Sequence, residues 1–209
     1  MQFRDVFQER VFNISNSLSV LRILLLPAFV YYSRAYVKSP ERDDLFYPLI
    51  TIILVGSLSD FLDGFLARLL NQETMLGRYL DPVADKLTGT VALITLVLYY
   101  SLPLWVFLIH VLREIGGVWM GTFLYFKRDM QGKPNIWGKL GVALTALLVV
   151  WYVLTPRLAS VYAGDHWFLH PEIVAYALVV VLIVGMISYW ATYWNVIFGT
   201  NGPGDKPAA

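Results

Sequence analysis

The chain contains little charge and no cysteine. Of its 209 residues, 15% are Asp, Glu, Lys or Arg, whereas soluble proteins contain about 25%. The absence of cysteine excludes disulfides and thiolate metal sites, so any bound metal must be held by oxygen or imidazole. The net charge of +1 gives no electrostatic basis for binding nucleic acid. These shortages argue against a soluble enzyme, a disulfide-stabilised scaffold and a nucleic-acid-binding protein.

The abundant residues are apolar. Hydrophobic residues make up 57% of the chain, and the mean hydropathy is +0.59. They form runs of about 20 residues, the length with which a helix crosses ~30 Å of hydrocarbon. The runs are 18–38, 46–69, 79–101, 103–126, 138–156 and 171–198. The sequence therefore predicts an all-α integral membrane protein with six transmembrane helices.

The two ends of the chain differ from these runs. Within residues 1–11, apolar side chains recur at helical spacing among charged ones, which predicts a short amphipathic helix in the membrane interface. Residues 199–209 are rich in Gly and Pro and predict a disordered tail after a single domain, 1–198. Arg22 within the first run and the lack of a small-residue cleavage pattern argue against a cleaved signal peptide.

Basic residues are distributed unevenly across the predicted membrane. Nine lie on the side of the N-terminus and four on the other side. The nine are Arg4, Arg10, Arg68, Arg78, Lys127, Arg128, Lys133, Lys139 and Lys206, and the four are Arg34, Lys38, Arg42 and Arg157. Because loops rich in Lys and Arg stay in the cytoplasm, we expect both termini to be cytoplasmic and the loop 157–170 to be external.

Four aspartates lie at the cytoplasmic end of the second run and the start of the third. An ionised side chain at the bilayer centre costs about 2.5–3.5 kcal/mol, so such a group needs cationic partners. Asp60 and Asp63 share a face of one helix at i, i+3, and Asp81 and Asp85 share a face of the next at i, i+4. The short connection 70–78 can bring the pairs together as four inward-facing carboxylates. Oxygen-only ligands favour hard cations, and two Mg²⁺ or Mn²⁺ ions would neutralise the negative charge of the four carboxylates.

The same acids have other interpretations. They can pair with Arg68, Arg78 and Lys86 as a structural network, or line a proton or cation path in a transporter. A non-catalytic membrane scaffold is a third possibility. The clustering of the acids at one membrane face, without an inverted repeat, favours an enzymatic site at the cytoplasmic face.

Eight residues between positions 60 and 85 stand in one fixed register. They are Asp60, Asp63, Gly64, Ala67, Arg68, Gly77, Asp81 and Asp85. This register matches every fixed position of the signature of the CDP-alcohol phosphotransferases, a family of six-span membrane enzymes that the chain resembles. The resemblance implies that Asp60, Asp63 and Asp81 hold two metal ions and that Asp85, also close to the metals, is the general base. It also implies that Gly64, Ala67, Arg68 and Gly77 shape the pocket for the cytidine diphosphate, and that the chain forms a homodimer.

The first run opens with Asn16, Ser19 and Arg22, with Pro27 following. This pattern resembles the phosphatidylglycerophosphate synthase branch of the family. Asn16 and Ser19 either contact the nucleotide or cap the helix that enters the membrane. Arg22 lies about one turn further in, where it can extend to lipid headgroups or reach the carboxylates.

The resemblance to this branch implies transfer of a phosphatidyl group from CDP-diacylglycerol to the hydroxyl of glycerol 3-phosphate, with release of CMP. Candidate ligands of the acceptor phosphate are Arg113, Lys139 and Arg22. Gly138-Lys139 resembles a Gly-Lys element of that branch, in which a second basic residue commonly follows by two positions, whereas this chain continues with Leu140-Gly141. A cardiolipin synthase that uses phosphatidylglycerol, or an enzyme for another polar alcohol such as inositol phosphate or serine, therefore stays open.

Overall fold

The computed structural model describes residues 14–69, 75–128, 136–162, 164 and 166–198. Within these ranges, the description does not include the side chains of residues 14–15, 60–69, 75–76, 78–79, 125, 127–128 and 195–198. The predicted interfacial helix near the N-terminus and the tail 199–209 lie outside the described residues, and both stay predictions.

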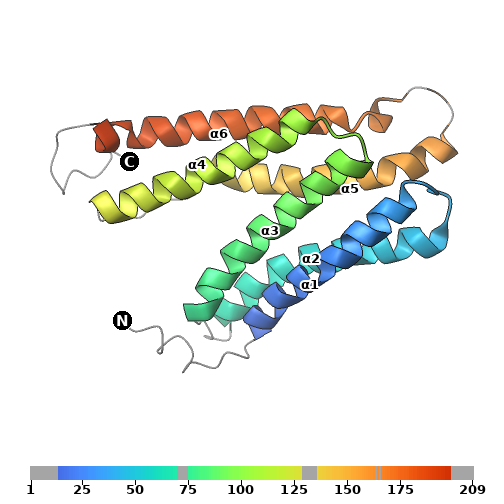
Figure 1. Cartoon of the computed structure of the whole chain (residues 1–209), viewed down its shortest axis with the longest axis horizontal. Coiled ribbons are helices and arrows are strands. Elements are labelled where there is room, and N and C mark those ends of the chain that lie inside the picture. Colours follow the sequence, from blue (N-terminus) through green and yellow to red (C-terminus); the bar gives the residue numbers. More distant parts are fainter. Residues whose placement is uncertain (1–13, 70–74, 129–135, 163, 165, 199–209) are drawn as a thin grey trace. The chain divides into compact units, whose positions relative to one another are not determined.

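Six long α-helices account for most of the described chain (Figure 1). They are α1 (Ile14–Tyr36), α2 (Asp43–Leu69), α3 (Met75–Tyr99), α4 (Leu104–Arg128), α5 (Ile136–Val161) and α6 (Glu172–Phe198). A short 3₁₀ helix, η2 (Trp167–Leu169), precedes α6. The described ranges contain no strand, so the all-α fold class is confirmed.

Five of these helices are long and apolar enough to cross a membrane. The spans are Asn16–Tyr36, Leu80–Tyr99, Leu104–Leu124, Ile136–Val161 and Glu172–Trp194. These five are counted among the described residues alone, which do not include the side chains of the last ten residues of α2. Large apolar side chains point away from the protein, for example Leu24, Leu54 and Leu112, each more than 60% exposed. Such surfaces are stable in lipid, so the protein is a multi-pass membrane protein.

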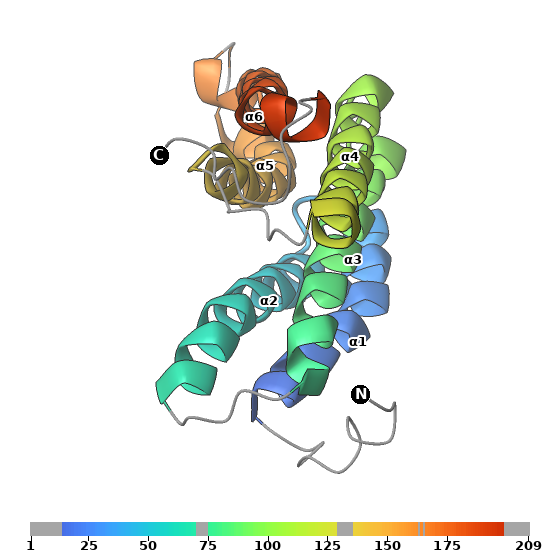
Figure 2. The same cartoon turned by 90° about the vertical axis from the view of Figure 1, so that its left-hand side faces the viewer.

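The chain divides into two compact units, residues 1–101 with 149–170, and residues 102–148 with 171–209. In the first unit, α1 packs against both α2 and α3, and Figure 2 labels these three helices. Phe29 on α1, Leu49 on α2 and Leu93 on α3 are buried. Ser19 and Arg22 near the N-terminus of α1 are also buried, and their side chains contact α3.

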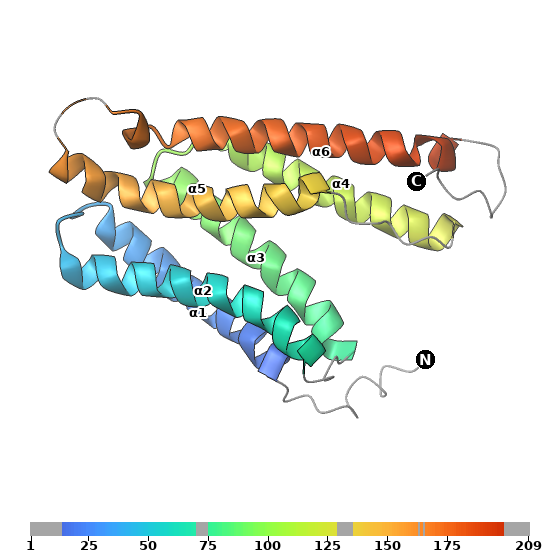
Figure 3. The same cartoon turned by 180° about the vertical axis from the view of Figure 1, so that it is seen from behind.

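The C-terminal part of α5 also belongs to the first unit (Figure 3). Arg157 Nη2 donates a hydrogen bond of 2.7 Å to Asp43 Oδ1 in the first turn of α2. The Arg157 guanidinium also lies 4.5 Å from the ring centroid of Phe46. The sequence predicts a helix that ends at residue 156, but α5 continues through Pro156 to Val161, and these contacts stabilise the additional turn.

In the second unit, α4 packs against α6. Met120 and Leu124 of α4 are buried with Tyr193 of α6. The N-terminal part of α5 approaches α6 closely at Gly185, where an added Cβ would lie 3.1 Å from the Cβ of Trp137. This distance is shorter than most Cβ contacts, so a larger residue at position 185 would require Trp137 to shift by a few tenths of an ångström.

Candidate active site

The candidate site begins with two aspartates on one face of α3. Because α3 begins at Met75, Asp81 lies in its second turn and Asp85 one turn later. This i, i+4 spacing places the two carboxylates one above the other. Asp81 is half-buried, and the Asp85 side chain is 54% exposed.

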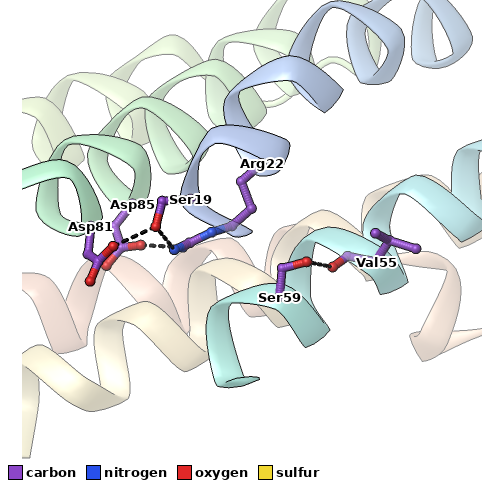
Figure 4. A network of polar contacts seen from close by, with 6 residues as sticks. All are labelled: Ser19, Arg22, Val55, Ser59, Asp81 and Asp85. Atoms are coloured by element: carbon purple, nitrogen blue, oxygen red, sulfur yellow. Dashed lines mark hydrogen bonds and ion pairs between the residues drawn. The ribbon is translucent and has the colours of Figure 1, made fainter. Parts of the chain in front are cut away.

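Two side chains of α1 reach these carboxylates (Figure 4). Ser19 Oγ donates a hydrogen bond of 2.5 Å to Asp81 Oδ1, and Arg22 Nη1 forms an ion pair with Asp85 Oδ1. Arg22 Nη2 also donates to Ser19 Oγ at 3.4 Å. The partners are 62 and 63 positions apart in sequence, so the docking of α1 on α3 assembles the group. Of the two destinations that the sequence leaves open for Arg22, lipid headgroups and the carboxylates, the structure shows the carboxylates.

The burial of the two partners in the Arg22–Asp85 pair is unequal. The Arg22 side chain is 3% exposed and that of Asp85 is 54% exposed. The Asp85 carboxylate thus faces α1, but it is not buried, because α3 is open to the surroundings at this position. An exposed carboxylate can contact a ligand without further movement of the helices.

The second pair of aspartates lies on α2, whose helical backbone includes Asp60 and Asp63. The structure does not describe the side chains of these two aspartates, nor those of Ala67 and Arg68. It also does not describe the surroundings of Gly64. Ser59, directly before this segment, is buried, and its Oγ donates a hydrogen bond of 2.6 Å to the carbonyl of Val55. In the described part of the chain, no group of three or more His, Cys, Asp or Glu side chains is close enough to hold a metal. The meeting of the two pairs stays a prediction.

The other predicted nucleotide ligands lie at the starts of helices. Asn16 is in the first turn of α1 and is buried, and Gly77 is buried in the first turn of α3. Ser19 lies beyond the first turn of α1, and its hydroxyl bonds to Asp81. Helix capping therefore does not explain Ser19.

The two remaining acceptor candidates, Arg113 and Lys139, lie in the second unit. Arg113 on α4 is 26% exposed and pairs with its neighbour Glu114, which is 22% exposed. Lys139 is exposed in the first turn of α5. The charge of Arg113 is therefore balanced by Glu114 on the same helix. One turn before Arg113, His110 is buried, and its Nδ1 has no hydrogen-bond partner in the described part of the protein.

A hollow of about 320 Å³ occurs in the first unit, beside the C-terminal part of α5. Its lining residues are Trp151, Leu154, Leu158, Tyr162 and Phe168. None of these five described residues is charged, and Trp151 Nε1 donates a hydrogen bond of 3.0 Å to the carbonyl of Phe168. These lining residues include none of the candidate site residues.

Comparison with known proteins adds independent information. The CDP-alcohol phosphatidyltransferase family model matches residues 12–200. The CDP-diacylglycerol–glycerol-3-phosphate 3-phosphatidyltransferase of Aquifex aeolicus is 28% identical over 188 residues, which cover 89% of this chain and 98% of that protein. The protein of the same name from Pseudomonas fluorescens is 31% identical over 194 residues, 86% of each chain. The cardiolipin synthase (CMP-forming) of Streptomyces coelicolor is 40% identical over 115 residues, 54% of this chain and 52% of that protein.

Proposed function

Because the chain belongs to the CDP-alcohol phosphatidyltransferase family, we propose that it transfers a phosphatidyl group from CDP-diacylglycerol to the hydroxyl of glycerol 3-phosphate and releases CMP. The observation that carries this proposal is the contact of Asp81 and Asp85 with Ser19 and Arg22. It joins the family motif on α3 to the α1 pattern that resembles the phosphatidylglycerophosphate synthase branch. The names of the Aquifex aeolicus and Pseudomonas fluorescens relatives support the choice of acceptor.

In this reaction the acceptor hydroxyl oxygen forms a new bond to the lipid-side phosphorus of the donor. The bond from that phosphorus to the bridging oxygen of the diphosphate breaks, and CMP leaves with the oxygen. The hydroxyl proton passes to the Asp85 carboxylate, which acts as the general base. The exposure of Asp85 supports this role, because a base must lie within hydrogen-bond distance of the proton that it accepts.

The donor atoms available fit a hard divalent cation. Asp81 and Asp85 present carboxylate oxygens from adjacent turns of α3, and a chain without cysteine has no thiolate ligand. We propose that Asp60, Asp63 and Asp81, with Asp85 beside them, hold two Mg²⁺ or Mn²⁺ ions. Bound there, the ions would neutralise the negative charge of the donor diphosphate.

The cytidine diphosphate is proposed to lie against the starts of α1 and α3 and the end of α2. The residues assigned to it are Asn16, Ser19, Gly64, Ala67, Arg68 and Gly77. The burial of Asn16 and Ser19, and the contact of Ser19 with Asp81, support this assignment. For the acceptor phosphate we propose Arg113, Lys139 and Arg22, since Arg and Lys are the side chains that bind phosphate groups.

Cardiolipin synthesis is the alternative that a specific observation supports. The Streptomyces coelicolor relative bears that name, and Leu140-Gly141 takes the place where the phosphatidylglycerophosphate synthase branch commonly has a second basic residue. With phosphatidylglycerol as acceptor, the same donor and the same aspartates would be used.

Identification of the lipid product tests the proposal. The purified protein is incubated with CDP-diacylglycerol, Mg²⁺ or Mn²⁺, and a mixture of glycerol 3-phosphate, phosphatidylglycerol, inositol phosphate and serine, and the lipids are identified by mass spectrometry. We expect phosphatidylglycerophosphate and an equal amount of CMP. Cardiolipin instead would reassign the acceptor, and CMP release without any lipid product would contradict the transfer itself.

A further inference from the structure

Among the described residues, Arg22 has the only charged side chain that is buried, where Asp, Glu, Lys and Arg count as charged. A buried guanidinium is costly unless a carboxylate balances its charge. Asp85 supplies that carboxylate, although its own side chain is 54% exposed. The more costly partner of the pair is therefore the cation, and α1 keeps it in place with its side chain directed at the α3 aspartates (Figure 4).

The α1 side chains engage one oxygen on each aspartate. Arg22 Nη1 engages Asp85 Oδ1, Ser19 Oγ engages Asp81 Oδ1, and Arg22 Nη2 donates to Ser19 Oγ. These contacts form one connected network across the two turns of α3. A carboxylate oxygen that accepts a charge-assisted hydrogen bond is a weaker ligand for a second cation, because the two cations compete for the same negative charge.

We propose that Arg22 is a positioning residue, which serves as a built-in counter-cation for the α3 aspartates. It holds Asp85 when no divalent cation is bound, and it gives up this contact when a divalent cation binds to the aspartates. This inference depends on the proposed function, because it takes the aspartates to be cation ligands. It assigns to Arg22 a role toward Asp85 in addition to any contact with substrate.

The ion pair with Arg22 also limits the ability of Asp85 to act as the general base. While Arg22 engages Asp85 Oδ1, one carboxylate oxygen of Asp85 is taken up by the ion pair. Release of Arg22 makes this oxygen available to accept the proton of the acceptor hydroxyl. Asp85 is then fully available only in the metal-loaded protein.

Mn²⁺ binding without lipid substrates tests this competition. The full-length protein in detergent is titrated with Mn²⁺ by calorimetry, and bound Mn²⁺ is counted by electron paramagnetic resonance. We expect Arg22→Gln to bind Mn²⁺ about tenfold more tightly than the wild type, the effect of removing one charge-assisted competitor. Arg22→Lys keeps the positive charge and should stay within about threefold of the wild type. The control Arg34→Gln removes an exposed arginine from the same helix and should have no effect.

Each result of the titration has a defined meaning. Equal Mn²⁺ affinity of Arg22→Gln and the wild type would overturn the counter-cation role and leave the proposed reaction intact. Arg22→Lys binding as tightly as Arg22→Gln would also overturn it, because charge would then not be the cause. Wild-type protein that binds no Mn²⁺, or binds it equally well after Asp81→Asn, would instead contradict the metal site of the proposed function.

A measurement on the wild-type protein does not depend on the folding of a variant. Phenylglyoxal modifies arginine side chains, and mass spectrometry reports the rate at each position. We expect saturating Mn²⁺ to increase the modification rate of Arg22 at least threefold, because the guanidinium leaves its ion pair with Asp85. Arg34 is the internal control, whose rate should not change. An unchanged rate at Arg22 would overturn the proposal.

Discussion

Asp81 and Asp85 occupy successive turns of the same helix, yet their partners on α1 differ in charge. Asp81 accepts a hydrogen bond from the neutral hydroxyl of Ser19, whereas Asp85 faces the guanidinium of Arg22. Asp81 is also the less exposed of the two. A half-buried carboxylate with a neutral partner suits a metal ligand, and an exposed one with a displaceable cation suits a proton acceptor.

Asp85→Asn should separate catalysis from donor binding. The amide keeps the shape of the side chain but does not accept a proton at neutral pH, so we expect turnover to fall by about 10²–10⁴-fold. Binding of CDP-diacylglycerol, followed with a fluorescent analogue, should change little because the other three aspartates remain. Asp44→Asn, at an exposed position in the first turn of α2, is the matched control. Near wild-type turnover of Asp85→Asn would exclude Asp85 as the base.

Ser19→Ala should destabilise the docking of α1 on α3. The hydroxyl is fully buried and donates to Asp81, and loss of such a bond costs about 0.5–1.5 kcal/mol. Unfolding in mixed SDS micelles measures this free energy. Ser57→Ala, at an exposed position on α2, should have no measurable effect. Equal stability of the two variants would show that the hydrogen bond contributes nothing to docking.

The site could be predicted from sequence only as far as local spacing defines it. The register of the aspartates on their helices depends on the spacing within each helix, and the sequence was sufficient for it. Arg22 had two possible destinations, lipid headgroups and carboxylates, and the sequence did not distinguish them. Its partner Asp85 is 63 positions away, so the choice depends on how α1 docks against α3, which a pattern along one helix does not encode.

At the scale of helices, the apolar runs located all six elements, and the differences lie at their ends. The third run predicts a start at residue 79, whereas α3 begins at Met75. The run begins late because Arg78 interrupts the apolar pattern, but a helix continues beyond the hydrocarbon where the backbone can still bond to itself. The end of α5 differs for a tertiary reason, the contacts of Arg157 with Asp43 and Phe46.

Arg157→Gln should loosen the end of α5. The change removes the ion pair with Asp43 and the contact of the cation with the Phe46 ring, so we expect the melting temperature in detergent to fall by roughly 2–4 °C. Arg42→Gln is the matched control, because Arg42 pairs with Asp44 at a site where both side chains are more than half exposed. Exposed pairs contribute little to stability. A melting temperature of Arg157→Gln equal to that of the control would contradict the role of this contact.

At the scale of the whole molecule, one family model extends over residues 12–200 and therefore over both compact units. Membership of an enzyme family replaces the transporter and scaffold interpretations of the aspartates. A single domain over 1–198, a homodimer, and cytoplasmic termini with a cytoplasmic active site remain proposals. The distribution of basic residues supports the orientation, because loops rich in Lys and Arg are retained in the cytoplasm.

The orientation can be tested with single cysteines, since the chain has none of its own. Ser160→Cys introduces a thiol at an exposed position near the end of α5, and Lys206→Cys introduces one in the C-terminal tail. We expect a membrane-impermeant maleimide to label intact cells at position 160 and to label position 206 only after the membrane is permeabilised. The reverse pattern would show that the protein is inserted with the opposite orientation.

The Arg157–Asp43 contact also has a consequence for synthesis of the protein. Its two residues are 114 positions apart, and ribosomes add about 5–20 residues per second, so Arg157 is translated roughly 6–23 s after Asp43. A nascent chain that carries only the first three helices therefore lacks the partner that holds the start of α2. During this interval α2 is held by its packing against α1. Its contact with α5 forms only after α5 has been translated.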